Sequence, residues 1–221
     1  MVKDLFVRDF DEKLHVKATQ IAVNNHTTLA SIVTDAIDKW IKNYEKVRHR
    51  HNLILYSDET SLSKILGEID KLASDNWLKS FCGSTKHSGI QILNKRKWFD
   101  ATANNYDEFL EKPQEAATKV LENINNEIGS SRTLLPLTVA FLVEDLARKE
   151  SVKKAAGFCE WYERKSTPGI TFCIANARNV LTASFDDLFN LFDAHTGVFL
   201  VKNNKIYRLR LDDEHFYSLL V

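Results

Sequence analysis

One loop of this chain combines small, hydroxyl-bearing and basic residues that could bind or transform a small molecule. Its residues are Gly83, Ser84, Thr85, Lys86, His87, Ser88 and Gly89. Backbone N–H groups between two glycines, with a lysine beside them, can cradle a phosphate. The loop matches neither the Gly-x-x-x-x-Gly-Lys-Ser/Thr nor the Gly-x-Gly-x-x-Gly pattern of nucleotide-binding loops. It is therefore either an ordinary surface loop or the ligand site of the chain.

Three other groups of reactive residue types are less complete. Cys82 and His87 could form a nucleophile pair, but no orienting third group follows from the sequence. His49 and His51 could share one side of a strand, yet no further metal-ligand spacing follows, and a solvated linker is the preferred interpretation. The basic and aromatic residues 95–99 could contact nucleic acid or form an edge strand. We expect no catalytic residue, no metal ion and no cofactor.

A short strand is predicted at the N-terminus. Leu5 and Val7 alternate with Asp4, Phe6 and Arg8, and strand side chains have a period of two. This strand has no hairpin partner in the following forty residues. The same strand of a second chain is the simplest partner, and it would complete a two-stranded antiparallel ribbon.

Two amphipathic helices are predicted after this strand. Apolar residues recur at helical spacing from about residue 11, and the Asn-Asn-His sequence at 24–26 ends that pattern. Thr27 or Thr28 can cap the second helix, whose apolar positions between residues 29 and 41 have the strongest periodicity in the chain. Because two such short helices cannot bury their apolar faces alone, we expect a homodimer, or a higher oligomer built from it.

Residues 3–43 resemble the ribbon-helix-helix family of the Arc, MetJ and CopG repressors, and its antitoxin-type members in particular. The resemblance is carried by Arg8-Asp9, Asp11-Glu12, Lys17-Ala18, the turn Asn25-His26-Thr27 and the apolar second helix. It implies DNA binding, in which the ribbon of the dimer enters the major groove.

The resemblance also implies roles for particular side chains. Arg8 would read a guanine. Phe6 would contact a thymine methyl group or turn into the core, and Asp4 would accept from a cytosine amino group or point away from the DNA. Thr27 and Thr28, at the start of the second helix, would present backbone N–H groups to a DNA phosphate.

Charge and cysteine usage limit the classes of protein. The chain has 30 basic and 30 acidic residues, of which nine basic and seven acidic residues lie in residues 1–52. The net charge is therefore +2 for residues 1–52 and −2 for the remainder. Three widely spaced cysteines, Cys82, Cys159 and Cys173, fit a reducing cytoplasm better than a disulfide framework. The longest apolar run is too short to cross a bilayer, so no membrane partner is expected.

The remaining sequence predicts a mixed α/β domain with five to seven strands. We expect strands at residues 53–56, 90–93, 170–175 and 180–183 and a hairpin at 197–211. Helices are expected from Asp58, from Pro136 to residue 149, after Ser184 and at 213–220. The predicted fold class is α+β: a ribbon-helix-helix domain at residues 1–46, a linker at 47–52, and an α/β sensor or partner-binding domain at 53–221.

The predicted function is that of a cytoplasmic transcriptional repressor. A homodimer would bind double-stranded DNA, and residues 53–221 would sense an unknown small molecule or bind a partner. Two alternatives stay open: an antitoxin-like interaction protein, and an enzyme acting on a nucleotide or another phosphorylated molecule near residues 83–89.

Overall fold

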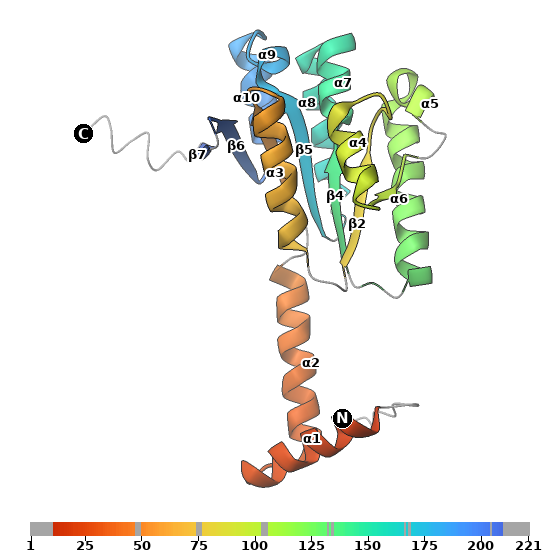
Figure 1. Cartoon of the computed structure of the whole chain (residues 1–221), viewed down its shortest axis with the longest axis vertical. Coiled ribbons are helices and arrows are strands. Elements are labelled where there is room, and N and C mark those ends of the chain that lie inside the picture. Colours follow the sequence, from red (N-terminus) through yellow and green to blue (C-terminus); the bar gives the residue numbers. More distant parts are fainter. Residues whose placement is uncertain are drawn as a thin grey trace, which may run out of the picture. The chain divides into compact units, whose positions relative to one another are not determined.

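The chain divides into two compact units, Met1–Val47 and Arg48–Val221 (Figure 1). The structure is a computed structural model that describes residues 11–46, 50–73, 77–102, 106–131, 133, 135–165, 167, 169–203 and 205–209. Within 40–46 the backbone alone is described. No helix among these residues has both the length and the apolar character needed to cross a bilayer.

The described part of the first unit consists of two helices, α1 (Glu12–Asn24) and α2 (Leu29–Lys46). The Asp11 carboxylate caps α1 by accepting from the N–H of Leu14 at 2.8 Å. Thr28 caps α2 by accepting from the N–H of Ser31 at 3.1 Å. The left-handed residue between the helices is His26, with φ of 50°. Both helices agree with the sequence prediction.

The predicted fold class is wrong. The described chain begins with helices rather than with a β-ribbon, and the second unit is an α/β fold with a mostly parallel sheet. The physical reason is the order of elements: strands and helices alternate along the chain, so successive strands return parallel to one another through helical crossovers. The strand expected at residues 4–8 and the helix expected at 213–220 lie outside the described residues.

Seven strands form one sheet in the order β3-β2-β4-β5-β1-β6-β7. The strands are β1 (Arg50–Tyr56), β2 (Trp77–Cys82), β3 (Phe99–Asp100), β4 (Leu135–Ala140), β5 (Ile170–Asn176), β6 (Gly197–Lys202) and β7 (Lys205–Leu209). All neighbouring pairs are parallel except β6 and β7, which form the predicted hairpin. β1 pairs with β5 from Arg50↔Ile170 to Tyr56↔Asn176, so the two strands end at the same edge of the sheet.

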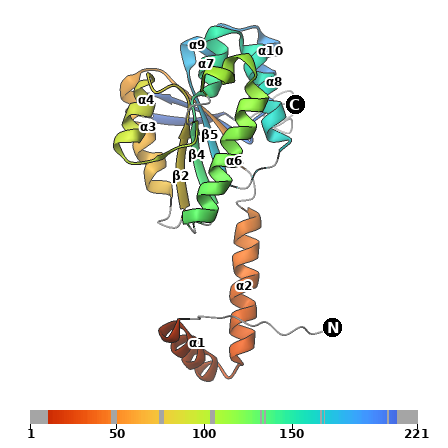
Figure 2. The ribbon, with the colours of Figure 1, turned by 90° about the vertical axis from the view of Figure 1, so that its right-hand side faces the viewer.

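Helices cover both faces of this sheet. They are α3 (Glu59–Leu72), α4 (Ser88–Lys95), α5 (Tyr106–Glu111), α6 (Pro113–Ser131), α7 (Leu142–Lys149), α8 (Val152–Glu163), α9 (Ala177–Val180) and α10 (Phe185–Asp193). Figure 2 shows α3 and α4 on one side of the strands and α6 and α8 on the other. The sheet is therefore the middle layer of three, which explains why its central strands are apolar on both faces.

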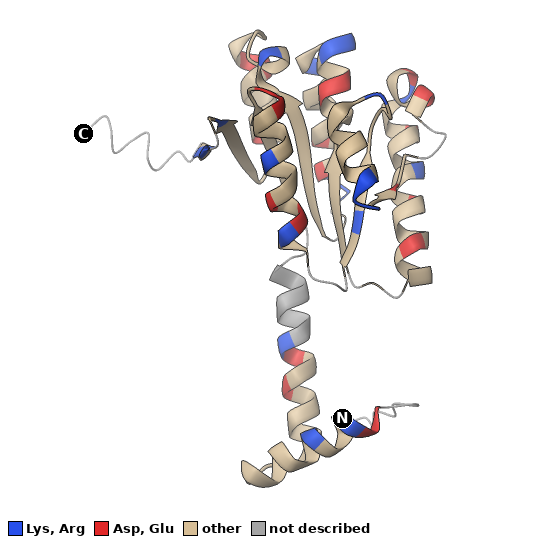
Figure 3. Ribbon diagram, viewed as in Figure 1, with Lys and Arg blue, Asp and Glu red and all other residues tan. Residues whose placement is uncertain are grey.

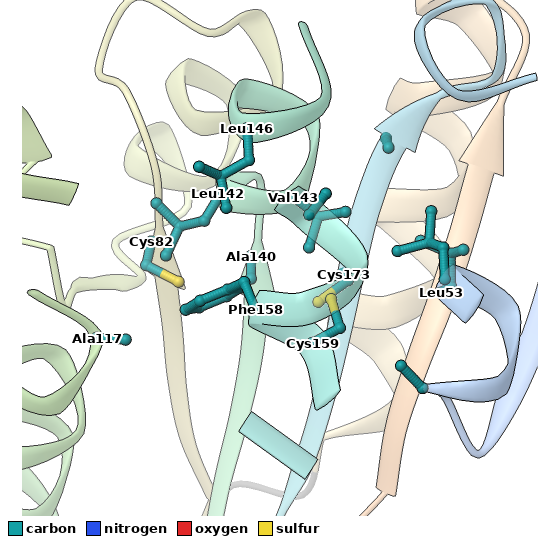
Figure 4. Close-up of a cluster of buried hydrophobic side chains, with 14 of the residues drawn as sticks. Leu53, Cys82, Ala117, Ala140, Leu142, Val143, Leu146, Phe158, Cys159 and Cys173 are labelled. Carbon is teal, nitrogen blue, oxygen red and sulfur yellow. The ribbon is translucent and has the colours of Figure 1, made fainter. Parts of the chain in front are cut away.

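Each face of the sheet has its own core. Against α3 and α4, buried residues such as Leu62 and Leu93 pack on Ile54 and Val139 of the strands. On the side of α5 to α10, a second buried cluster contains Leu53 of β1 together with Phe109 and Phe158 of the helices. Figure 4 shows part of this second core, where the side chains of α7 and α8 meet those of β1, β4 and β5.

Three local predictions are wrong for reasons that the structure makes clear. Residues 90–93, expected as a strand, belong to α4, whose first turn is capped by His87 and whose buried Ile90 and Leu93 are three residues apart. The expected helix from Pro136 to residue 149 is β4 followed by α7. Pro136 is tolerated in a central strand because the pairing of β4 with β5 begins one residue later. The strand expected at 180–183 is the end of α9 and the turn after it.

Candidate functional site

A hollow of about 780 Å³ lies at the edge of the sheet where the parallel strands end. Tyr56 and Asn176 are the last residues of the neighbouring strands β1 and β5, and both line it. The chain leaves β1 towards α3 on one face and leaves β5 towards α9 on the other. The chain likewise leaves β2 towards α4 on one face and leaves β4 towards α7 on the other. Open α/β sheets bind ligands at such switch points, so the topology favours this edge as a binding site.

The predicted ligand loop forms one wall of this hollow. Ser84, Thr85, Lys86 and His87 all line it. Gly83 opens the loop with φ of 147°, a conformation that favours glycine, and an added Cβ would lie 2.7 Å from the Ile90 side chain.

Most backbone N–H groups of the loop already have partners within the protein. Those of Gly83, Lys86 and Gly89 donate to the side chains of Thr102, Ser84 and His87, at 2.8, 3.3 and 3.1 Å respectively. The N–H of His87 donates to the carbonyl oxygen of Ser84 at 2.9 Å. Recognition of an anion by this loop would therefore depend mainly on side chains such as Lys86.

A buried carboxylate, Glu144 in the first turn of α7, organises the floor of the hollow. Its Oε2 accepts from the Tyr56 hydroxyl at 3.1 Å and from the backbone N–H of Asn176 at 2.9 Å. Its Oε1 accepts from the side-chain amide of Asn179 at 3.1 Å. Glu144 thereby joins the ends of β1, β4 and β5.

His87 completes this network at longer range. Its Nδ1 accepts from Gly89, which in the neutral ring leaves the proton on Nε2. Nε2 lies 3.6 Å from Oε2 of Glu144 and 3.5 Å from the Tyr56 hydroxyl. Burial alone would raise the pKa of Glu144, but the donors His87, Asn176 and Tyr56 together hold it below its ordinary value. Burial and the Glu144 carboxylate raise the pKa of Tyr56, which therefore remains a hydrogen-bond donor.

The neighbouring carboxylate Asp145 is 1% exposed and only partly satisfied. Its Oδ1 accepts from Arg148 at 3.2 Å, whereas its buried Oδ2 makes no hydrogen bond within the described structure. The hydroxyl of Tyr106, which also lines the hollow, is buried without a hydrogen bond as well. Burial, followed by an interaction with the nearby Asp145 side chain, raises the pKa of this phenol. Buried polar atoms without well-formed hydrogen bonds are costly, so these two atoms are natural contact points for a ligand.

Both basic and acidic side chains line the hollow. Lys86, Arg148 and Lys149 line it together with Glu59 and Asp107. Figure 3 shows acidic positions followed by basic positions along α7, at the end of the sheet where the strands finish. The mixture favours a ligand that carries both anionic and hydrogen-bond-donor groups.

The turn between β1 and α3 does not provide the usual phosphate site of doubly wound folds, where a glycine-rich turn precedes a free helix N-terminus. Here the Asp58 carboxylate caps α3 by accepting from the N–H of Ser61 at 2.9 Å, and Glu59 follows in the first turn. Two carboxylates at that helix end disfavour an anion.

The other predicted site residues lie elsewhere. Asp4, Phe6 and Arg8 fall outside the described residues, and Thr27 and Thr28 lie between α1 and α2. Cys82 does not join the hollow that His87 lines; it faces an interior cavity instead, and burial raises the pKa of its thiol.

The sequence prediction missed the polar residues contributed by other strands and helices. These are Tyr56, Tyr106, Glu144, Asp145 and Asn176. The signal that could have found Tyr56 and Asn176 is their position directly at the end of apolar strands. Glu144 and Asp145 were hidden because the strand before them was interpreted as the start of a helix.

Comparison with known proteins adds little. No protein-family model and no curated protein matches the chain. A solved structure from Pyrococcus horikoshii OT3, described as a structural study of PH0250, is similar, with a TM-score of 0.47 and 12% identity. The alignment covers 78% of this chain and 93% of that one.

Proposed function

We propose that the chain is a ligand-responsive regulatory protein whose Arg48–Val221 unit binds a small molecule in the hollow at the strand ends. The observation that carries this proposal is the buried Asp145 carboxylate, which lines the hollow with one oxygen unpaired. A ligand hydroxyl or amino group would satisfy that oxygen, and an anionic group would suit Lys86 and Arg148. A phosphorylated sugar or nucleoside has both features.

Binding is proposed rather than turnover because the strongest acid–base groups are committed to the fold. Glu144 already accepts three hydrogen bonds, from Tyr56, Asn176 and Asn179. The raised pKa of Tyr56 keeps its hydroxyl protonated, so it does not act as a base near neutral pH.

Titration calorimetry with ribose 5-phosphate, adenosine 5′-monophosphate and inorganic phosphate tests the site. We expect the two organic phosphates to bind and inorganic phosphate to bind more weakly. Lys86→Ala should weaken the binding, whereas Lys95→Ala should not, because Lys95 is also exposed but lies at the other end of α4. Absence of saturable binding, or equal affinity in the two variants, contradicts the proposal.

Self-association is proposed for the Met1–Val47 unit. Its helix α1 exposes Leu14 by 55%, Val16 by 49% and Val23 by 66%. A two-helix unit of this size buries too little apolar surface to be stable alone. Val23→Glu should therefore lower the molar mass measured by light scattering. Leu181→Glu, at a position 50% exposed in the other unit, should leave it unchanged. A monomeric wild type would remove this part of the proposal.

Double-stranded DNA in the cytoplasm is the proposed partner of the dimer, and a repressor is the proposed role. The support is the resemblance of residues 3–43 to DNA-binding repressors, together with cysteines that are all free. A bound ligand could alter DNA affinity only by changing the population or spacing of the dimers.

Genomic footprinting tests the DNA proposal. Arg8→Ala should abolish discrete protected sites while the dimer persists, and Lys13→Ala, an exposed position on α1, should retain them. Unchanged occupancy with Arg8→Ala would exclude Arg8 as a base-reading residue.

A further inference from the structure

Two cysteines and two histidines from distant parts of the sequence meet inside the Arg48–Val221 unit. They are His51 at the start of β1, Cys159 in α8, Cys173 in β5 and His195 between α10 and β6. Their exposed fractions are 1%, 0%, 3% and 8%, respectively. One nitrogen or sulfur atom from each lies within 4.8 Å of all the others. We propose that these four side chains bind one structural Zn²⁺ ion.

Backbone contacts hold the four side chains in place. Within the sheet, His51 is in register with Thr171, two residues before Cys173 on the same strand, so both side chains project towards α8. The loop that carries His195 is tied to β1, because the N–H of Thr196 donates to the carbonyl of His51 at 2.7 Å. Figure 4 shows Cys159 of α8 next to Cys173 of β5.

The donor set and its separations suit zinc. Two thiolates and two imidazoles are a common tetrahedral set for structural zinc. Zinc–sulfur and zinc–nitrogen bonds of about 2.3 and 2.0 Å place the ligand atoms about 3.3 to 3.8 Å apart. Nε2 of His51 is already 3.0 Å from Sγ of Cys173, so the cluster needs only local adjustment to close around an ion. Four protein ligands would leave no open position, which favours a structural ion over a catalytic one.

Each histidine also has the outer contact that zinc-binding histidines usually have. Nδ1 of His195 lies 2.6 Å from the carbonyl oxygen of Leu191, to which it can only donate. Nε2 of that ring is then an acceptor, and it is buried without a hydrogen bond in the described structure. Nδ1 of His51 lies 3.3 Å from the Glu163 carboxylate. A proton on Nδ1, held by these contacts, leaves Nε2 of each neutral ring as the atom that can bind a metal ion.

The cluster has space beside it. An interior cavity of about 30 Å³ is lined by His51 and Cys173 and by the hydroxyl-bearing residues Thr138, Tyr162 and Thr171. Side chains can therefore adjust around an ion without displacing a packed core. The ion would connect β1, β5, α8 and the loop before β6.

Metal analysis of the full chain tests this inference independently of the ligand and DNA proposals. The protein should be produced without a histidine tag, with added zinc, and analysed by plasma mass spectrometry. We expect one zinc ion per chain in the wild type and its loss in Cys159→Ser and Cys173→Ser. Cys82→Ser is the matched control, because Cys82 is also buried but lies outside the cluster; it should retain the metal.

Two further measurements avoid dependence on variants that fail to fold. Wild-type protein loaded with Co²⁺ should show sulfur-to-cobalt charge-transfer absorption, which Zn²⁺ should abolish. Glu163→Gln, which keeps all four ligands, should weaken zinc binding by about 10- to 100-fold. A folded wild type that takes up neither metal, or that contains a Cys159–Cys173 disulfide instead, would overturn the inference.

Discussion

Replacing Glu144 by alanine should destabilise the fold more than any other single change at the strand ends. The carboxylate is 7% exposed and accepts from Tyr56, Asn176 and Asn179 at 3.1, 2.9 and 3.1 Å. Because these donors belong to β1, β5 and α9, the substitution removes the polar connection between three elements.

The magnitude follows from the donors that lose their acceptor. A hydrogen bond to a charged group contributes about 1.5 to 3 kcal/mol. Tyr56 is 2% exposed, and the Asn176 N–H lies at the end of a central strand, so water replaces Glu144 poorly for both. Relief from burying a charge offsets part of the loss. Glu144→Ala should therefore lower the free energy of unfolding by about 3 to 5 kcal/mol, and Glu144→Gln, which keeps the shape, by about 1 to 2 kcal/mol.

Urea denaturation at pH 7, followed by circular dichroism, measures both values. Glu150→Ala is the matched control, because Glu150 is an exposed carboxylate directly after α7 whose ion pair with Lys154 lies on the surface. It should change the free energy of unfolding by no more than about 0.5 kcal/mol. A Glu144→Ala variant within about 1 kcal/mol of the wild type would refute the view that this carboxylate connects the strand ends.

Three further outcomes are expected. The pKa of Glu144 is lowered, so the difference in unfolding free energy between wild type and Glu144→Gln should be complete above the ordinary glutamate pKa of about 4.3. It should disappear as the pH falls through the folded-state pKa of Glu144. Urea titrations at neutral and acidic pH measure this difference, and a value that does not change with pH would contradict the assigned ionisation. Gly89→Ala should destabilise by about 1 to 3 kcal/mol, because its Cβ would lie 2.4 Å from the Phe141 ring. Gly157 lies in a helix, and no atom lies within 4 Å of the Cβ that an alanine would add. Gly157→Ala should therefore raise the free energy of unfolding by about 0.5 to 1 kcal/mol, which thermal denaturation would show as a higher melting temperature. Equal effects of Gly89→Ala and Gly157→Ala would contradict this account.

Part of the candidate site could be predicted from the sequence because its signal is local. The loop from Gly83 to Gly89 is recognisable from composition alone, and it lies in one wall of the hollow. The floor of the hollow comes from Tyr56, Glu144 and Asn176, whose proximity depends on the order of strands in the sheet. No spacing along the chain encodes that order.

The same distinction holds for the proposed zinc site. Zinc-binding sequences are usually recognised by short spacings between paired ligands. In this chain His51, Cys159, Cys173 and His195 come from β1, α8, β5 and the loop before β6, and no two of them are closer than 14 positions along the sequence. Taken separately, each is an ordinary histidine or a small buried cysteine, so the sequence supported a prediction of no metal.

The sequence by itself determined the features that depend on neighbouring residues. The helix starts expected at Asp58 and after Ser184 and the hairpin between β6 and β7 agree with prediction, because each involves contacts over only a few residues. Only the tertiary structure decided that β4 is a strand and that its neighbours are parallel. An apolar run such as residues 135–140 is compatible with a buried helix and with a strand that is covered on both faces. Which of the two forms depends on the layers that pack against the segment in the folded protein.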